Sequence, residues 1–318
     1  MDTLDLPAVE AARRRLRDAI VQTPCAYSQT LSELTGARCF VKLENLQMTG
    51  SFKERGAANL LLQLAPEDRR RGVIAASAGN HGLAVAFHAA RLGIPTTIVM
   101  PEYAPLIKVT NARRYGAEVV LHGSNFDEAY ERARAVEAER GLIFVHPFDD
   151  PRVVAGQATL GLEVLEQLPD VEALVVPVGG GGLIGGVALA VKGVRPDVQV
   201  IGVQSAALPA MSRSLQTGER VRVDAAPTMA DGIAVRQVGA LTYELARTWV
   251  DHVVTVDEEE LSNAVLLLLE IEKTVVEGAG AAPLAAALKD KQRKPGKAGL
   301  ILSGGNVDTD VYAQVLSA

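Results

Sequence analysis

Four consecutive glycines, residues 179–182, form the part of this sequence best suited to holding a ligand. They follow the apolar run 174–178 and precede residues compatible with a helix, which predicts a strand, a tight loop and a helix N-terminus. Such a loop can turn successive backbone N–H groups toward one point, where the helix dipole adds positive potential. Four adjacent glycines also cost backbone entropy that close packing alone seldom requires. We therefore expect an anion site with phosphate as its occupant.

The residues around this loop weaken the two common nucleotide interpretations. A nucleotide triphosphatase loop needs a lysine and a serine or threonine after its last glycine, whereas Leu183 follows Gly182 here. Gly180, Gly182 and Gly185 have the spacing of a dinucleotide loop. However, the next predicted strand leads to Gln204, not to the acidic residue that would hold a ribose. A nicotinamide enzyme is therefore disfavoured but stays open on these residues.

Lys53, in the segment Ser-Phe-Lys-Glu-Arg-Gly of residues 51–56, is the second candidate for chemistry. A lysine that begins a helix is usually a solvated charge. Behind Phe52 and facing a cleft, it would instead be desolvated, which lowers its pKa and makes the amine nucleophilic. A nucleophilic lysine and a phosphate cradle on one cleft suit a cofactor that carries both an aldehyde and a phosphate.

Alternating strand-like and helix-like segments must position these groups. Strands are predicted at 39–43, 73–77, 96–100, 119–121, 142–145, 174–178, 199–203, 252–256 and 299–302, and helices at 53–64, 106–115, 126–140 and 151–168. Repeated βα units predict parallel sheets with helices on both faces, and residues 147–151 mark the best boundary. Ligands in such sheets bind beyond the carboxyl ends of the strands. Because the glycines at 79, 82, 179–182 and 304–305 all follow strand ends, we expect their loops to converge on one cleft.

Composition excludes several classes of function. The 318-residue chain has a net charge of −6 and an aromatic content of 4%. It therefore lacks both the positive charge that attracts nucleic acid and the aromatic side chains on which bases stack. No segment predicts a membrane helix, and the N-terminus lacks the apolar core of a signal peptide. Two cysteines indicate a reducing compartment, so we expect a cytoplasmic protein. The five histidines show no metal-ligand spacing, and we expect no metal site.

Several motifs together occur in the order seen in pyridoxal-phosphate serine/threonine dehydratases, and the chain resembles that family from about Val21 to Asp308. The motifs are residues 51–56, Ser-Ala-Gly-Asn-His-Gly at 77–82, the tetraglycine, Ala-Asp-Gly at 230–232, Glu-Gly-Ala-Gly at 277–280 and Ser-Gly-Gly-Asn at 303–306. The resemblance implies an α/β fold of the tryptophan-synthase-β type (fold type II), with two doubly wound domains and mainly parallel sheets. A small domain, 47–148, carrying Lys53 and the Asn80 loop, would be inserted into a large cofactor-binding domain, 1–46 and 149–318.

The same resemblance implies a role for each motif. Lys53 would bind pyridoxal 5'-phosphate as a Schiff base and, once freed, would remove the α-proton of the substrate. Phe52 would pack beside the cofactor ring, Asn80 would meet the ring hydroxyl, and Ser303 would meet the pyridine nitrogen. The phosphate would be held by Gly179, Gly180, Gly181, Gly182 and Leu183. The substrate would contact Ser77, Ala78, Asn80, His81 and Gly232.

Ser303 bears on the type of reaction. A carboxylate at that position would keep the ring nitrogen protonated and favour transamination or racemisation, whereas a neutral hydroxyl leaves a weaker electron sink. A carbanion with a β-hydroxyl would then preferentially expel it. We expect elimination of L-threonine to 2-oxobutanoate and ammonia, and also of L-serine to pyruvate.

Other activities remain as alternatives. Serine racemases of this family place a second serine where this chain has Ala78, whose methyl group cannot move a proton. Racemases and some dehydratases also hold a divalent metal with an acidic residue where Gln204 stands here, so we expect no such metal. Dehydratases of hydroxyaspartate or of the hydroxyectoine pathway, a β-replacement enzyme such as a cysteine synthase, and a phosphate-binding module without chemistry stay open.

The resemblance also implies an assembly and a length class. We expect a homodimer or homotetramer that acts on a small-molecule amino acid. Biosynthetic threonine dehydratases continue into a C-terminal regulatory domain, whereas this sequence stops soon after Asp308. We expect either a short enzyme of the catabolic type or a truncated one, without feedback inhibition by isoleucine.

Overall fold

The computed structural model describes residues 4–289 and 296–317, and their strands form two sheets. The larger sheet has the order β1 (Cys25–Ser28), β2 (Arg38–Leu43), β10 (Lys297–Leu302), β7 (Ala173–Pro177), β8 (Gln199–Ser205) and β9 (His252–Val256). The smaller sheet has the order β5 (Glu118–Leu121), β4 (Thr96–Met100), β3 (Val73–Ala76) and β6 (Ile143–Phe144). All described pairings between the named strands are parallel except β1 with β2. The α/β fold class with mainly parallel sheets is therefore confirmed.

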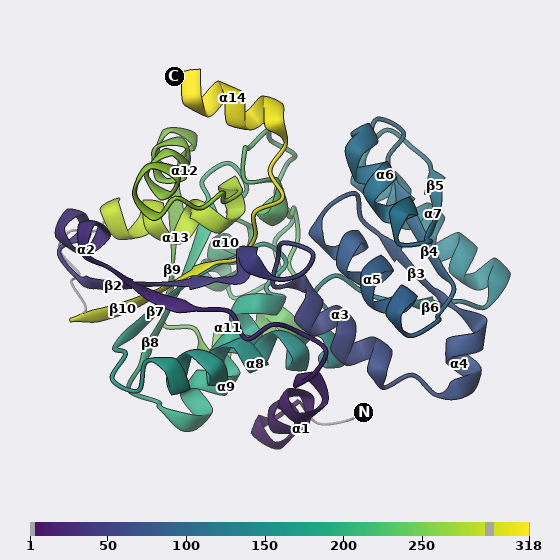
Figure 1. The fold of residues 1–318 in the computed structure, drawn as a ribbon, viewed down its shortest axis with the longest axis horizontal. Helices are drawn as coiled ribbons and strands as arrows, with labels where there is room; N and C mark the ends of the chain where they lie inside the picture. Colours follow the sequence, from purple (N-terminus) through teal and green to yellow (C-terminus); the bar gives the residue numbers. More distant parts are fainter. Residues whose placement is uncertain (1–3, 290–295, 318) are drawn as a thin grey trace.

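Helices cover both sheets. They are α1 (Leu6–Leu16), α2 (Gln29–Thr35), α3 (Lys53–Leu62), α4 (Pro66–Arg71), α5 (Asn80–Arg91), α6 (Leu106–Arg114), α7 (Phe126–Arg140), α8 (Pro151–Gln167), α9 (Gly182–Val194), α10 (Ala210–Thr217), α11 (Ala240–Trp249), α12 (Glu258–Glu272), α13 (Gly278–Lys289) and α14 (Thr309–Ser317), with 3-10 turns η1 (Glu44–Leu46) and η2 (Asp231–Ile233). In Figure 1, α12 and α13 lie on one side of the larger sheet and α8, α9 and α11 on the other. No helix among the described residues combines the length and apolarity needed to span a membrane.

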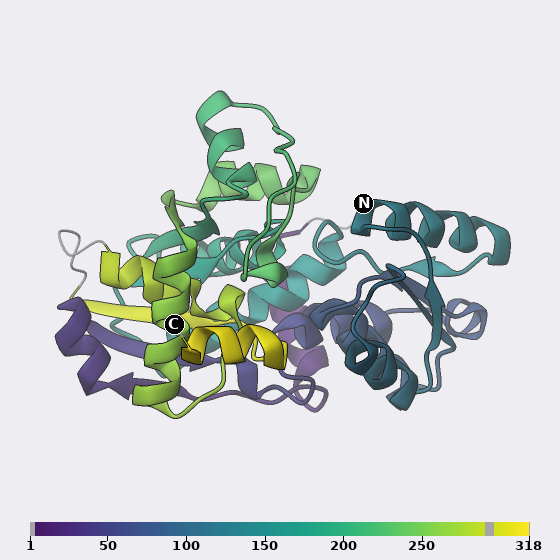
Figure 2. The same cartoon turned by 90° about the horizontal axis from the view of Figure 1, so that it is seen from above.

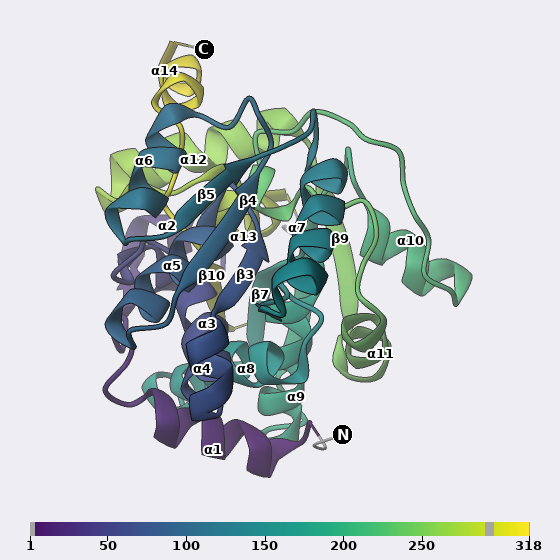
Figure 3. The same ribbon diagram turned by 90° about the vertical axis from the view of Figure 1, so that its right-hand side faces the viewer.

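The two sheets lie side by side (Figure 2). Every strand of the smaller sheet falls between residues 73 and 144, and both flanking parts of the chain contribute to the larger sheet. Figure 3 shows α5 and α6 on one side of the smaller sheet and α7 on the other. This is the doubly wound arrangement that a run of βα units dictates. The division into domains at 47–148 stays a prediction.

Local patterns account for most of these elements. The predicted strands at 96–100 and 252–256 and the helix at 126–140 have the bounds found in the structure. At the start of α12, the Asp257 side chain accepts a hydrogen bond from the Glu260 N–H at 2.9 Å, and Glu260 accepts one from the Asp257 N–H at 2.8 Å. The elements α1, β1 and α2 were not predicted. A local signal was present for α1, because Asp5 caps the helix by accepting from the Ala8 N–H and a proline lies in its first turn. The elements β1 and α2 span only 4 and 7 residues.

Glycines bring α3, α8 and α9 close together beneath the cleft. A Cβ on Gly156 would lie 2.4 Å from the Arg55 carbonyl oxygen, and one on Gly186 would lie 2.7 Å from the Val154 carbonyl oxygen. Side chains at these two positions would force the helices apart. Their absence fixes α3 on α8 and places Lys53, the first residue of α3, next to the larger sheet.

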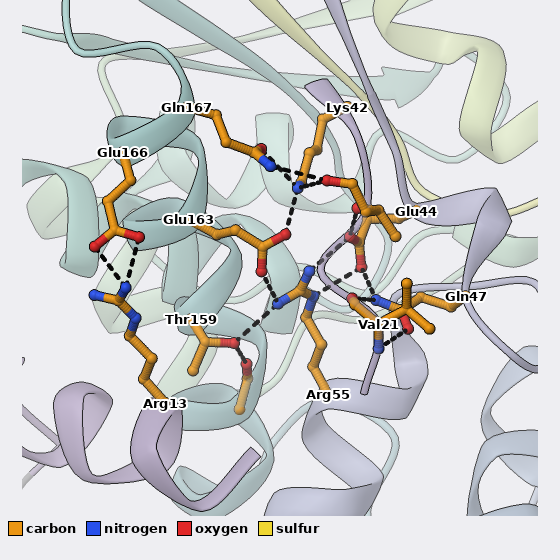
Figure 4. Close-up of polar contacts among 12 residues, drawn as sticks. Arg13, Val21, Lys42, Glu44, Gln47, Arg55, Thr159, Glu163, Glu166 and Gln167 are labelled. Atoms are coloured by element: carbon orange, nitrogen blue, oxygen red, sulfur yellow. Dashed lines mark hydrogen bonds and ion pairs between the residues drawn. The ribbon is translucent and has the colours of Figure 1, made fainter. Parts of the chain in front are cut away.

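A buried ion network holds this helix in place (Figure 4). The guanidinium of Arg55 donates to Glu44 at 2.7 and 2.8 Å and to Glu163 at 2.9 Å. Lys42 donates to Glu163 and, at 2.6 Å, to the Thr23 carbonyl oxygen. Two cations and two carboxylates balance, and all four side chains lie in the interior. The network ties β2, η1 and α8 to the first turn of α3.

The first prediction concerns Arg55. In the variant Arg55→Met, Glu44 keeps its burial but loses its cation, and breaking a buried pair in this way costs about 3–5 kcal/mol. We expect this loss of unfolding free energy to lower the urea concentration at the midpoint of unfolding, which circular dichroism measures.

Arg13→Ala is the matched control, because it removes an ion pair to Glu166 whose two side chains are largely exposed. Such surface pairs contribute about 0–1 kcal/mol, so its midpoint should barely move. Equal midpoints for the two variants would show that the buried network does not anchor α3.

Candidate active site

A cavity of about 910 Å³ opens between the two sheets. Its lining includes all the residues to which the sequence analysis assigned a cofactor or substrate contact, namely Phe52, Lys53, Ser77, Ala78, Asn80, His81, Gly179, Gly180, Gly181, Gly182, Leu183, Gly232 and Ser303. The loops that follow β3, β7 and β10 all reach this cavity, as expected for the carboxyl ends of parallel strands. The convergence predicted from the glycines is therefore found, while the roles assigned to the individual residues stay predictions.

The segment that carries Lys53 is bound directly to the loop after β10. The Phe52 N–H donates to the Ser303 carbonyl oxygen at 3.0 Å, and the Gly305 N–H donates to the Gly50 carbonyl oxygen at 2.9 Å. Between them, Ser51 and Gly304 form an isolated antiparallel bridge. These contacts hold the start of α3 beside Ser303 although some 250 residues separate them in the sequence.

Lys53 has the environment of a reactive amine. Its Nζ donates to the Pro147 carbonyl oxygen at 2.8 Å and lies 5.3 Å from the centre of the Phe52 ring. The side chain lines the cavity but is otherwise surrounded by protein atoms. This burial lowers the pKa of Lys53 to about 8, although the charge of Glu277 acts in the opposite direction. An appreciable fraction of the amine is therefore neutral near physiological pH.

The tetraglycine lines the cavity and packs so closely against its neighbours that side chains at these positions would clash with them. A Cβ on Gly180 would lie 2.3 Å from the Phe148 ring, and one on Gly179 would lie 3.0 Å from the Ile233 Cα. Gly181 has φ of +96°, a left-handed conformation that favours glycine, and it caps α9. The first N–H groups of a helix have no partner within it, so those of α9 can bind an anion here.

The residues of this cavity fit pyridoxal phosphate. The glycine cradle suits a phosphate, the Lys53 amine suits an aldehyde, and the buried Ser303 hydroxyl, which lines the cavity, suits a pyridine nitrogen. Within the described part of the chain, no three His, Cys, Asp or Glu side chains form a group that could hold a metal ion.

Asn80 is oriented by two residues that the sequence analysis did not select. Its Nδ2 donates to Glu277 Oε1 at 2.8 Å, and its Oδ1 accepts from Asn306 Nδ2 at 2.8 Å. Asn306 also donates to the Thr49 carbonyl oxygen at 2.7 Å. Glu277 opens one of the motifs quoted above, which was the one signal available for it. Only the fold shows that its carboxyl group reaches Asn80.

His81 and His146 are neutral residues of the cavity wall. The His81 Nε2 hydrogen-bonds the Val145 carbonyl oxygen at 2.8 Å, and the His146 Nδ1 accepts from the Asp149 N–H at 2.8 Å. Burial, reinforced by the nearby charge of Lys53, lowers the pKa of His81 to about 3. Burial likewise lowers the pKa of His146 to about 4. The His81 ring thus binds a backbone carbonyl, and its predicted contact with substrate stays untested.

Ion pairs join the two sides of the cavity at its lining. Lys108 on α6 pairs with Asp231 at 3.4 Å and with Asp308 at 3.1 Å. Asp127 on α7 pairs with Arg222 and with Arg236. Sequence spacing did not predict these contacts, because each joins residues 95 to 200 positions apart. They connect helices of the smaller sheet with the loops that precede α11 and α14.

Comparison with known proteins agrees with this geometry. The sequence profile of the family described as "Pyridoxal-phosphate dependent enzyme" matches residues 16–304. L-threonine ammonia-lyase of Thermotoga maritima is 52% identical over 99% of this chain and 78% of its own. The solved structure of threonine deaminase isoform 2 from Solanum lycopersicum has a TM-score of 0.94 at 36% identity, covering 98% of this chain and 86% of that one. That of maize serine racemase also has a TM-score of 0.94, at 35% identity, covering 98% and 97%.

The second prediction follows from the burial of Lys53. Burial disfavours the ammonium form, so in the cofactor-free protein the reactive amine should predominate above about pH 8, against an ordinary lysine value of 10.5. Brief treatment with limiting acetic anhydride across a pH series, followed by peptide mass spectrometry, measures this. Surface lysines quantified in the same digest provide the comparison. A Lys53 curve that rises only near about pH 10 would contradict the assignment.

The third prediction concerns the cradle. In Gly180→Ala the new methyl group must displace Phe148, and overpacking of this kind costs about 1–3 kcal/mol, so affinity for pyridoxal phosphate should fall about tenfold. Fluorescence titration of the cofactor-free protein measures it. Gly193→Ala, later in α9, meets no atom closer than 3.6 Å and should bind normally. Equal affinities of the two variants would argue against a phosphate at the cradle.

Proposed function

The chain belongs to the family of pyridoxal-phosphate dependent enzymes, and we propose that it is an L-threonine ammonia-lyase. It would convert L-threonine to 2-oxobutanoate and ammonia, and L-serine to pyruvate and ammonia. The observation that carries this proposal is the meeting, in one cavity, of a desolvated lysine, a glycine cradle and a neutral Ser303 hydroxyl. The high identity to a protein named L-threonine ammonia-lyase supports it.

We assign the predicted roles to this chain's residues as follows. Bound pyridoxal phosphate supplies an electron-withdrawing ring that accepts the electron pair left on the substrate Cα. The N–H groups of residues 179–183 bind its phosphate, and Lys53 binds its aldehyde carbon. When it is not bound to the cofactor, the Lys53 Nζ would remove the Cα proton of the substrate as a general base. The low pKa of Lys53 favours the neutral form that this step requires.

Contacts with the cofactor ring would decide between loss of the β-hydroxyl and reprotonation at Cα. Phe52 would pack beside the ring, Asn80 would donate to the ring hydroxyl with its remaining N–H, and Ser303 would meet the ring nitrogen. Because Ser303 is neutral, the ring is a weaker electron sink than one paired with a carboxylate. The electron pair therefore expels the β-hydroxyl in preference to being reprotonated at Cα.

We propose that the substrate carboxylate binds at the start of α5. Ser77, Ala78, Asn80 and His81 surround that helix N-terminus, whose N–H groups and dipole favour an anion. Gly232 would allow the substrate to approach from the opposite wall. The small domain, 47–148, would thus bring Lys53 and the carboxylate site to a large domain that holds the cofactor.

Racemisation is the main alternative, and the fold does not discriminate against it, since the two solved structures above have the same TM-score. Ala78 favours elimination, because its methyl group lines the cavity where a racemase would place a second proton donor. The hydroxyaspartate, hydroxyectoine-pathway and β-replacement activities differ in the group on Cβ, so a substrate panel separates them.

Assembly and location belong to the same proposal. We propose a homodimer or homotetramer acting in the cytoplasm. The two cysteines support a reducing compartment, since both are free and Cys39 is buried. Light scattering on the purified protein measures the assembly.

The fourth prediction tests the reaction. L-threonine and L-serine should yield 2-oxo acids in a dinitrophenylhydrazine assay. Their rates should exceed those with the D-enantiomers and with 3-hydroxyaspartate, and the rate of sulfide consumption with O-acetylserine. Lys53→Ala, which lacks the base, should lose at least about a thousandfold in activity. Borohydride reduction should fix the cofactor mass on the Lys53 peptide of the wild type alone. If chiral chromatography finds D-serine formed from L-serine faster than pyruvate, the chain is a racemase.

A further inference from the structure

Expulsion of the β-hydroxyl requires a proton, because hydroxide is a poor leaving group. Lys53 acquires one proton from Cα, and the neutral His81 and His146 rings are poor acids. Lys108 is held in two ion pairs. The carboxyl groups that line the cavity are the remaining acidic side chains that could donate this proton.

Among the described lining residues, four of the five carboxyl groups already have cationic or N–H partners. They are Asp127 with two arginines, Asp149 with the first N–H groups of α11, and Asp231 and Asp308 with Lys108. The fifth is Glu277. It has no cation within hydrogen-bonding distance in the part of the chain that the structure describes. A carboxyl group in that situation is best placed to keep its proton.

Glu277 lies where three segments of the cavity meet. Its N–H donates to the Gly304 carbonyl oxygen at 3.1 Å, and its Oε1 accepts from Asn80 at 2.8 Å. Added Cβ atoms on Gly304 and Gly232 would lie 2.6 and 3.1 Å from the same oxygen. The carboxyl group also accepts a hydrogen bond from the Asn306 backbone amide, and among the described residues Asn80 is the side chain that donates to it, so neither oxygen faces a cation.

The local charges favour the protonated acid. Burial and, next, the negative charge of Asp231 on η2 raise the pKa of Glu277 to about 8. The Asn80 hydrogen bond, the Lys108 ammonium on α6 and the Asn306 backbone amide act in the opposite direction. Near neutral pH the cavity thus holds both a fraction of neutral amine at Lys53 and a neutral acid at Glu277, the forms that a base and an acid need.

We propose that Glu277 is the general acid that protonates the departing β-hydroxyl, an inference that rests on the proposed elimination. As Lys53 Nζ takes the Cα proton, the electron pair of the Cα–H bond forms the Cα–Cβ double bond. The Cβ–O bond breaks, and the oxygen keeps the bonding pair and takes the Glu277 proton to leave as water. Transfer of one proton from the Lys53 ammonium to the Glu277 carboxylate restores both groups.

Glu277→Gln separates this role from support of Asn80. Glutamine keeps the size and the Oε1 acceptor, but its amide is not an acid. L-serine is compared with β-chloro-L-alanine, whose chloride leaves without a proton. We expect kcat for L-serine to fall about 100-fold, and the ratio of kcat/KM for chloroalanine to that for serine to rise at least about tenfold. A parallel loss on both substrates, or no loss on either, overturns the proposal.

Asn306→Ala is the matched control. It removes the other hydrogen bond that orients Asn80 but leaves the acid in place. Both substrates should lose activity in parallel, and their ratio should stay constant. A ratio that rises as in Glu277→Gln would show that the effect comes from Asn80 and would overturn the proposal.

Two further measurements complete the test. Cofactor-free Glu277→Gln should bind pyridoxal phosphate with an affinity within about twofold of wild type; a large loss would mean that Glu277 holds the cofactor instead.

In Asp231→Asn, removal of the negative charge lowers the pKa of Glu277. The turnover of serine should therefore decline at a lower pH than in the wild type, while the pH profile of chloroalanine turnover does not shift. The remaining charges near Glu277 are those of Lys53 and Lys108, with Asp308 paired to the latter. An unshifted serine profile would count against the acid.

Wild-type turnover of L-serine tests the proposed function separately. If the wild type turns over neither L-serine nor L-threonine, both the proposed lyase activity and the role of Glu277 are wrong. Wild-type turnover with an unchanged substrate ratio in Glu277→Gln overturns only the role of Glu277.

Discussion

The structure depends on the balance of charge buried beneath the first turn of α3. Arg55 can be fully buried only because Glu44 and Glu163 surround its guanidinium, and Glu163 in turn needs Lys42. These partners come from β2, η1 and α8, so the helix cannot shift without separating buried charges. Lys53 lies two residues before Arg55. Its position relative to the larger sheet is therefore set by electrostatics on the side of the helix turned away from the cavity.

In the cavity, by contrast, Lys53 and Glu277 are buried without a close partner of opposite charge. At Lys53 and Glu277 desolvation is only partly compensated, and it acts in opposite directions on the amine and on the carboxyl group. It lowers the pKa of the Lys53 amine and raises that of the Glu277 acid, each to about 8. Both groups are thereby brought toward neutrality near physiological pH. One physical cause, burial without a close counter-ion, thus shifts both pKa values in the direction that the proposed base and the proposed acid require.

Close packing links these two regions. Gly156 and Gly186 let α3, α8 and α9 approach to backbone contact, and Gly180 and Gly182 leave room for Phe148. The glycine loop is thereby a contact surface for the chain leaving the smaller sheet, in addition to its proposed role as an anion cradle. This double use explains four glycines in succession better than phosphate binding alone, because each position has a neighbour that a side chain would strike.

Sequence alone determined the elements with strong periodicity and the loops at their ends. The βα alternation, the capping box at Asp257 and the glycine loops after β3, β7 and β10 are local patterns, and each predicted the structure found. Lys53 and the tetraglycine were selected by residue type and spacing, which a single segment contains. What the tertiary structure decided are contacts between distant segments. The Arg55 network, the Phe52 bond to Ser303 and the Asn80 bond to Glu277 join residues up to 251 positions apart. Their burial and pKa values arise from packing, which no local pattern encodes.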